Sequence, residues 1–124
     1  MTAVVVHWQD VADTLGCLES LRADSGVDVV VVDNASREPI PDGVGARVIR
    51  SAENSGYAGG ANLGIRAALA KGADVVLVLN NDVRVRAGAT AAAVAALAAD
   101  PRIAAVGAKG RIGHSAVRRG KPKD

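Results

Sequence analysis

Aliphatic runs alternate with stretches of helical periodicity over the first 108 residues of the chain. A continuous β-branched run is typical of a buried strand, and apolar residues that recur every three or four positions are typical of an amphipathic helix. Strands that alternate with helices predict an open, mostly parallel, Rossmann-like α/β sheet with flanking helices. On this basis we predict strands at 3–7, 27–32, 47–49, 75–79 and 103–106, and helices at 11–24, 59–71 and 87–99.

The ends of these elements carry residues that begin or end regular structure. Asp10 or Asp13 is suited to cap the first helix, and Gly72 lies at the C-cap position of the second. The third helix is expected to stop before Pro101, because a residue that precedes proline avoids the helical conformation. The weak apolar run at 47–49 predicts a strand at the edge of the sheet.

Polar residues follow the predicted strands where an open parallel sheet binds its ligands, beyond the carboxyl ends of the strands. They occur at 7–8, 33–34 and 80–82, and a segment rich in glycine lies between them at 53–64. The sequence therefore predicts a ligand site at this edge of the sheet.

The residues after the first two strands allow two interpretations each. Asp33 can accept a hydrogen bond from the N–H of a pyrimidine base, but Asp33 or Ser36 can equally organise a turn or cap a helix. Trp8 can stack on a base or a sugar. Because Trp8 and Tyr57 are the only aromatic residues and Phe is absent, the core is the favoured place for Trp8.

The glycine-rich segment favours an anion. Its small residues leave little bulk above the sheet, so a diphosphate can approach the backbone, and a helix that begins there presents N–H groups to it. The spacing matches neither the dinucleotide fingerprint nor the P-loop. Tight helix–sheet packing is the alternative, but Asn54 and Asn62 speak against it, because packing alone does not require amides.

Asp82 follows an aliphatic strand as a lone carboxylate. It can bind a hard divalent cation if phosphate oxygens supply further ligands, and the cation would stabilise charge on a departing nucleoside diphosphate. The alternative is a turn in which Asp82 caps a helix. His7 and His114 are too isolated to propose as ligands, and Cys17 is the only cysteine, which excludes an internal disulfide and a cysteine metal cluster.

Composition and charge narrow the class of protein. An apolar content of 49% in 124 residues predicts one folded domain. No apolar run approaches the roughly 20 residues of a membrane span, and the first residues do not form a secretory signal, so we expect a cytoplasmic protein. Residues 1–108 carry nine basic and twelve acidic residues, whereas residues 109–124 carry six basic and one acidic. We expect 109–124 to be a disordered, solvated basic tail that binds no nucleic acid.

Together these segments resemble the family-2 glycosyltransferases of the GT-A fold, and within them the bacterial rhamnosyltransferase-type branch. The resemblance implies inverting transfer of a sugar from a UDP- or dTDP-sugar to a glycan or natural-product acceptor, in the cytoplasm or at the inner face of the membrane. It runs from Ala3 to about Lys109, and its motifs lie at 3–8, 17–21, 32–36, 54–65 and 79–83.

The resemblance also implies a role for each motif. Asn80-Asn81-Asp82 takes the place of the family's DXD motif, with Asp82 as the main ligand of Mg²⁺ or Mn²⁺ and Asn81 beside it. Asn at the first position leaves one carboxylate in place of two, which implies weaker metal binding. The nucleoside would lie against Val6, Trp8, Asp33 and Asn34, and the diphosphate and sugar against Asn54, Gly56, Gly59, Gly60 and Asn62.

In family members the catalytic base lies in a second half that follows the donor-binding half. After Lys109 this chain has only GRIGHSAVRRGKPKD, so no base is nominated. We interpret 1–108 as an incomplete, truncated nucleotide-sugar-binding domain, and the activity of this chain alone stays open. The alternative is a non-catalytic nucleotide-binding fragment or subunit that needs a partner, and apolar surface left exposed by a short sheet would favour an oligomer.

Overall fold

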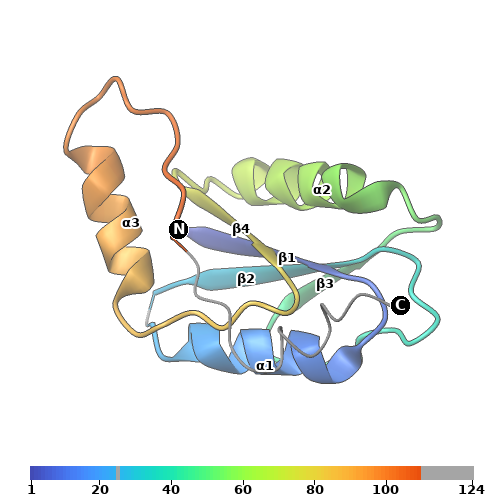
Figure 1. Cartoon of the computed structure of the whole chain (residues 1–124). Helices are drawn as coiled ribbons and strands as arrows, with labels where there is room; N and C mark the ends of the chain where they lie inside the picture. The colour runs from blue at the N-terminus through green and yellow to red at the C-terminus, as the bar shows by residue number, and fades with distance from the viewer. Residues whose placement is uncertain (25, 110–124) are drawn as a thin grey trace, which may run out of the picture. The chain divides into compact units, whose positions relative to one another are not determined.

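The computed structural model describes residues 1–24 and 26–109 (Figure 1). The chain divides into two compact units, the first at 1–90 and the second from residue 91 onward. The predicted tail at 109–124 lies, apart from Lys109, outside the described residues. The elements are β1 (Thr2–His7), α1 (Val11–Arg22), β2 (Asp28–Asp33), β3 (Arg47–Arg50), α2 (Gly56–Ala70), β4 (Val76–Asn80) and α3 (Ala89–Ala98).

A four-stranded parallel sheet forms the centre of the first unit. Its order is β3-β2-β1-β4, so β3 lies at an edge, as the weak run predicted. Val5 of β1 pairs with Val31 of β2 on one side and with Leu79 of β4 on the other. The predicted fold class, an open parallel α/β sheet with flanking helices, is confirmed.

The valine runs are buried because helices cover both faces of the sheet (Figure 1). Successive side chains of a strand point to opposite faces, so neighbouring valines enter different cores. A strand buried on both faces needs apolar residues at every position, which explains the absence of polar alternation. The core on the α1 face contains Ala3, Val5, Cys17, Leu18, Leu21, Val31 and Ile40, and the core on the α2 face contains Val4, Val30, Val32 and Ala68.

The glycines of α2 let this helix lie close to the sheet. Gly60 and Gly64 are buried. A Cβ atom on Gly60 would lie 3.0 Å from Cγ1 of Val6, and one on Gly64 would collide with the side chain of Val4. Tight helix–sheet packing, the alternative interpretation of the glycine-rich segment, therefore accounts for these two positions.

The helix ends agree in part with the sequence. Asp10, not Asp13, caps α1, because its Oδ1 accepts a hydrogen bond from the backbone N–H of Asp13 at 3.1 Å. Gly72 follows the C-cap residue Lys71 with a φ of +87°, a conformation that suits glycine. The helix predicted from residue 59 begins earlier, at Gly56.

The strand predicted at 103–106 is wrong. These residues have no regular structure, and no described strand pairs with them. Before them, Arg102 forms an ion pair with Asp100 at 2.6 Å, and the N–H of Ile103 donates to the carbonyl of Asp100 at 3.0 Å, which makes a turn. A short apolar run becomes a strand only where a neighbouring strand supplies hydrogen bonds. Within the described ranges, no helix is long and apolar enough to cross a membrane.

Cys17 is expected to resist alkylation in the folded protein. Burial raises the pKa of its thiol from 9.0 to about 11, and the positive charge of Arg84 offsets this only in part. About one Cys17 in a thousand is then a thiolate at pH 8. Because the unfolded thiol ionises first, this group's contribution to folding stability is complete below pH 9 and is lost as the pH rises through about 11.

Iodoacetamide labelling at pH 8 checks this expectation, since Cys17 is the only cysteine. Labelling should be slow in buffer and fast in denaturant. Equal rates in the two conditions would contradict the burial of the thiol.

Candidate functional site

The predicted polar segments gather at one edge of the sheet. Because the strands are parallel, their carboxyl ends lie together, and Figure 1 shows the start of α2 at the same edge. His7 pairs with Asp33, and Val6 pairs with Asn80. The structure thus places 7–8, 33–34 and 80–82 side by side, as the sequence predicted.

Asp33 is buried, and its carboxylate organises the loop after β2. Oδ1 accepts a hydrogen bond from the N–H of Ser36 at 3.0 Å, and Oδ2 accepts one from the N–H of Ile40 at 3.0 Å. Arg50 at the end of β3 forms an ion pair with Oδ2 at 3.0 Å and reaches Asp42 at 3.1 Å. The turn interpretation of Asp33 is therefore observed. Arg50 was missed from the sequence, where a lone arginine after a weak strand gives no signal.

Asn34 is also buried, and it joins the end of β2 to the start of α2. Its Nδ2 donates to Oδ1 of Asn54 at 3.0 Å and to the carbonyl of Gly56 at 2.9 Å. Its Oδ1 accepts from the N–H and the hydroxyl of Ser55 at 3.3 and 3.4 Å. The amide thus contacts three successive residues of the glycine-rich segment.

The N-terminus of α2 is open to an anion. Ser55 is the N-cap residue but makes no side-chain capping hydrogen bond, and the first turn contains no acidic residue. Asn54 accepts from the N–H of Gly56 at 2.9 Å, which fixes the entry of the chain into the helix. Asn62 lies exposed in the second turn. The first turn of a helix has N–H groups without an intrahelical acceptor and a partial positive charge, which together suit a phosphate.

Trp8 lies outside the core, and the favoured core interpretation is wrong. Its side chain is 52% exposed. The chain turns away from the sheet directly after the buried His7, because Gln9 and Asp10 take positive φ angles of 57° and 35°. The N–H of Gln9 donates to Oγ of Ser36 at 2.7 Å, which connects this turn to the loop after β2.

His7 belongs to a chain of hydrogen bonds that crosses the site. A carbonyl can only accept, so Nε2–H donates to the carbonyl of Glu38 at 2.7 Å, and in the neutral imidazole Nδ1 then accepts from the hydroxyl of Thr14 at 2.6 Å. Thr14 in turn accepts from Nδ2 of Asn81 at 3.1 Å. The buried histidine therefore links the loops after β2 and β4, a role the sequence analysis did not assign.

Asp82 and Asn81 follow the end of β4, and both carry side-chain oxygens. Asp82 is exposed. Burial raises the pKa of Cys17 most, Arg84 lowers it in part, and the negative charge of Asp82 raises it by a smaller amount. Among the described residues, no group of three or more His, Cys, Asp or Glu side chains could form a metal site. A carboxylate and an amide oxygen match the preference of Mg²⁺ and Mn²⁺, provided that a ligand completes the coordination.

Residues 2–124 match the model of glycosyl transferase family 2. The chain belongs to this family. It is 44% identical over 68 residues to the uncharacterized proteins Rv1525 of Mycobacterium tuberculosis and Mb1552 of Mycobacterium bovis, a match that covers 54% of the chain and 25% of each relative. The chain thus matches about a quarter of the length of these relatives.

A solved structure supports the fold. The chain is similar to the crystal structure of S. aureus TarS 1-349, with a TM-score of 0.60 and 18% identity over 79% of this chain and 32% of that chain. At this identity the similarity concerns the fold alone. Family membership and fold together confirm the predicted assignment to family-2 glycosyltransferases of the GT-A fold.

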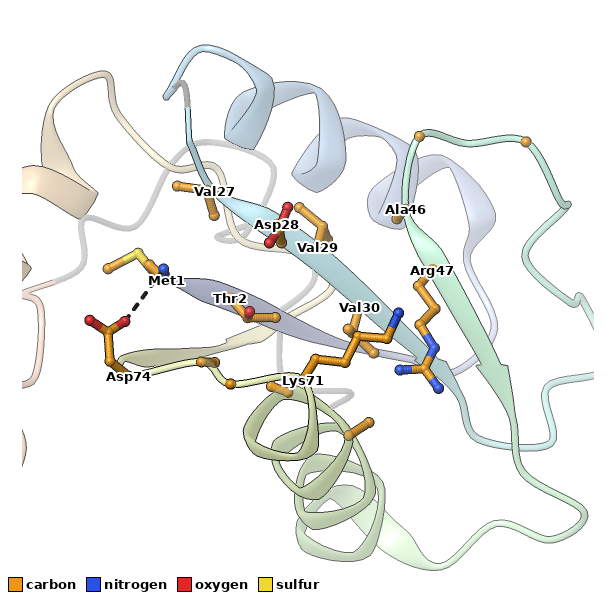
Figure 2. A pocket seen from close by; sticks show the side chains of 16 residues that line it. Met1, Thr2, Val27, Asp28, Val29, Val30, Ala46, Arg47, Lys71 and Asp74 are labelled. Atoms are coloured by element: carbon orange, nitrogen blue, oxygen red, sulfur yellow. Dashed lines mark ion pairs between the residues drawn. The ribbon is translucent and has the colours of Figure 1, made fainter.

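A hollow of about 740 Å³ lies at the opposite edge of the sheet (Figure 2). It is bordered by the starts of β1, β2 and β3 and by the end of α2, and the N-terminus of Met1 pairs with Asp74 there at 3.7 Å. None of the predicted site residues lines it. Ligands of open parallel sheets collect at the carboxyl edge, so we place the candidate site of this family-2 chain there and not in the hollow.

Proposed function

We propose that this chain binds the nucleoside-diphosphate-sugar donor of an inverting glycosyltransferase. The observation that carries the proposal is the convergence of the β2 end, the α2 N-terminus and the β4 end at one edge of the sheet in a family-2 chain. Residues 1–108 would form the donor-binding domain, and the acceptor would be a glycan or natural-product hydroxyl.

The α2 N-terminus would receive the diphosphate. The side chain of Asn54 accepts from the N–H of Gly56, but the N-cap residue Ser55 makes no side-chain hydrogen bond to the helix, and the first turn contains no acidic residue. The partial positive charge of the remaining N–H groups of this turn would therefore attract the anion. Gly56 and Gly59 add no side chain above this turn, so phosphate oxygens can approach the backbone. Asn62 in the next turn would contact the sugar or the second phosphate.

The nucleoside would lie between Trp8 and the end of β2. The exposed indole offers a face on which a base can stack. Asp33 already accepts three hydrogen bonds, and a carboxylate has about four acceptor positions, so one position is left for the N–H of a pyrimidine. Because Asp33 is 3% exposed, the loop after β2 would have to open for the base to reach it. This chemistry supports a UDP- or dTDP-sugar, the latter in line with the proposed rhamnosyltransferase-type branch.

Asp82 and Asn81 would bind Mg²⁺ or Mn²⁺ together with diphosphate oxygens. The cation supplies charge stabilisation to the leaving nucleoside diphosphate when it is bound. The hydrogen bond from Asn81 to Thr14 fixes the loop that presents these oxygens. We propose the cytoplasm, or the inner face of the membrane, as the place of the reaction.

A second candidate is a nucleotide-binding subunit that works with a partner chain. The aliphatic edge strand β4 favours it, because Val78 is 36% exposed and an exposed apolar strand edge suits pairing with another chain. Light scattering separates the two candidates, since a dimer or larger assembly supports the second.

Thermal unfolding with nucleotides tests the donor site. UDP or dTDP should raise the free energy of unfolding by about 2.7 kcal/mol at a hundredfold excess over Kd, and Mn²⁺ should increase this stabilisation. Asp82→Ala should remove the part that depends on Mn²⁺ and keep the rest. GDP and NAD serve as controls. If the unaltered chain unfolds cooperatively but no pyrimidine diphosphate shifts its melting temperature, the proposed function is wrong.

A further inference from the structure

The side-chain amide of Asn34 has no hydrogen-bonding position left for a ligand. An amide offers two N–H donors and two acceptor positions. Both donors go to Asn54 and Gly56, and both acceptor positions go to Ser55. Asn34 is 2% exposed, so exchanging one of these partners for a ligand would require the site to open.

The partners of Asn34 form the entry into α2. Ser55 is the N-cap residue, and Gly56, the first residue of the helix, has a φ of +76°. Gly60 in the second turn also packs on Asn34, because a Cβ atom there would lie 3.3 Å from Nδ2. One buried side chain therefore fixes both the backbone before the helix and the face of its second turn.

We infer that Asn34 is a positioning residue, which orients the N-terminus of α2 toward the diphosphate and does not touch the nucleoside. The inference rests on the proposed donor site, but it gives Asn34 a positioning role in place of a contact with the nucleoside. Substitution of Asn34 should therefore weaken binding of the diphosphate, which the helix N–H groups receive, and not binding of the base, which lies nearer to Trp8 and Asp33.

Asn34→Asp is the sharpest variant, because it keeps the shape of the side chain. It replaces Nδ2 by an oxygen that faces Oδ1 of Asn54 and the carbonyl of Gly56, so two attractive contacts become repulsive. Asn34→Ala removes the same contacts without adding charge. Thr90→Val is the matched control, because it deletes a hydrogen bond to Asp24, 2.6 Å long, beyond the C-terminus of α1.

The first measurement compares nucleoside diphosphates with nucleosides. In both Asn34 variants the affinity for UDP or dTDP should fall about tenfold, the effect of losing one charge-assisted hydrogen bond, whereas the affinity for uridine or thymidine should change less than twofold. Thr90→Val should change neither. A parallel loss of nucleoside and diphosphate affinity, or no loss of either, would overturn the inference.

The second measurement needs no ligand. Amide hydrogen exchange at 55–59 should become faster in the Asn34 variants, while exchange in β1 and β2 stays as in the unaltered chain. Faster exchange throughout the sheet would show a general loss of stability and would overturn the positioning role. Absence of any nucleotide binding by the unaltered chain would overturn the proposed function and this inference with it. Unchanged exchange at 55–59 would overturn the inference alone.

Discussion

Asp33→Ala is expected to lower the free energy of unfolding by about 2–4 kcal/mol. The substitution leaves the buried N–H of Ile40 without an acceptor and removes a charge-assisted hydrogen bond from Arg50. An unsatisfied buried donor costs about 1–3 kcal/mol, and a hydrogen bond to a charged group contributes about 1.5–3 kcal/mol. We expect a smaller loss of free energy of unfolding than for a fully buried ion pair, because Arg50 is half exposed and water can solvate its charge.

Asp42→Ala is the matched control in a urea titration. Asp42 also pairs with Arg50, at 3.1 Å, but its side chain is 90% exposed. Exposed ion pairs contribute about 0–1 kcal/mol, so this variant should unfold close to the unaltered chain. Equal losses in the two variants would mean that the burial of Asp33 does not decide its contribution.

Gly64→Ala is expected to destabilise the first unit by about 1–3 kcal/mol, although alanine favours a helix over glycine by about 1 kcal/mol. The added methyl would collide with Val4 and lie 3.0 Å from Cγ2 of Val32. Both valines are fully buried in the sheet, so neither side chain has free space to enter. The helix must shift outward or the core must repack.

Gly16→Ala in α1 measures the same change of residue without a collision against the sheet. A methyl at this position would meet the guanidinium of Arg84, the far end of a flexible, half-exposed side chain that can move away. Gly16→Ala should therefore be neutral or stabilising by up to about 1 kcal/mol. Urea unfolding of the two variants gives the packing contribution as their difference, and a neutral Gly64→Ala would refute the close approach of α2 to β1.

The order of elements and the location of the candidate site could be predicted from the sequence. Continuous valine runs require two covered faces, and helices between parallel strands supply that cover. Polar residues that follow each strand must then meet at one edge, whatever the detailed register. The strand at 103–106 and the core position of Trp8 were wrong, because a local pattern does not show whether a partner strand or a packing neighbour exists.

The tertiary structure alone decided which polar groups face one another. The hydrogen bonds of Asp33 to Arg50, of Asn34 to Asn54 and of Thr14 to Asn81 join residues 17, 20 and 67 positions apart. Such pairs form only when the register of the strands and the packing positions of the helices are fixed. The periodicity of apolar residues does not determine these two features closely enough to predict contacts between single polar groups. The sequence by itself thus determined a parallel α/β sheet with polar residues at one edge. The folded chain decided that Asp33 organises a loop and that Asn34 fixes the start of α2, because a buried polar group must satisfy its hydrogen bonds with whatever the fold brings to it.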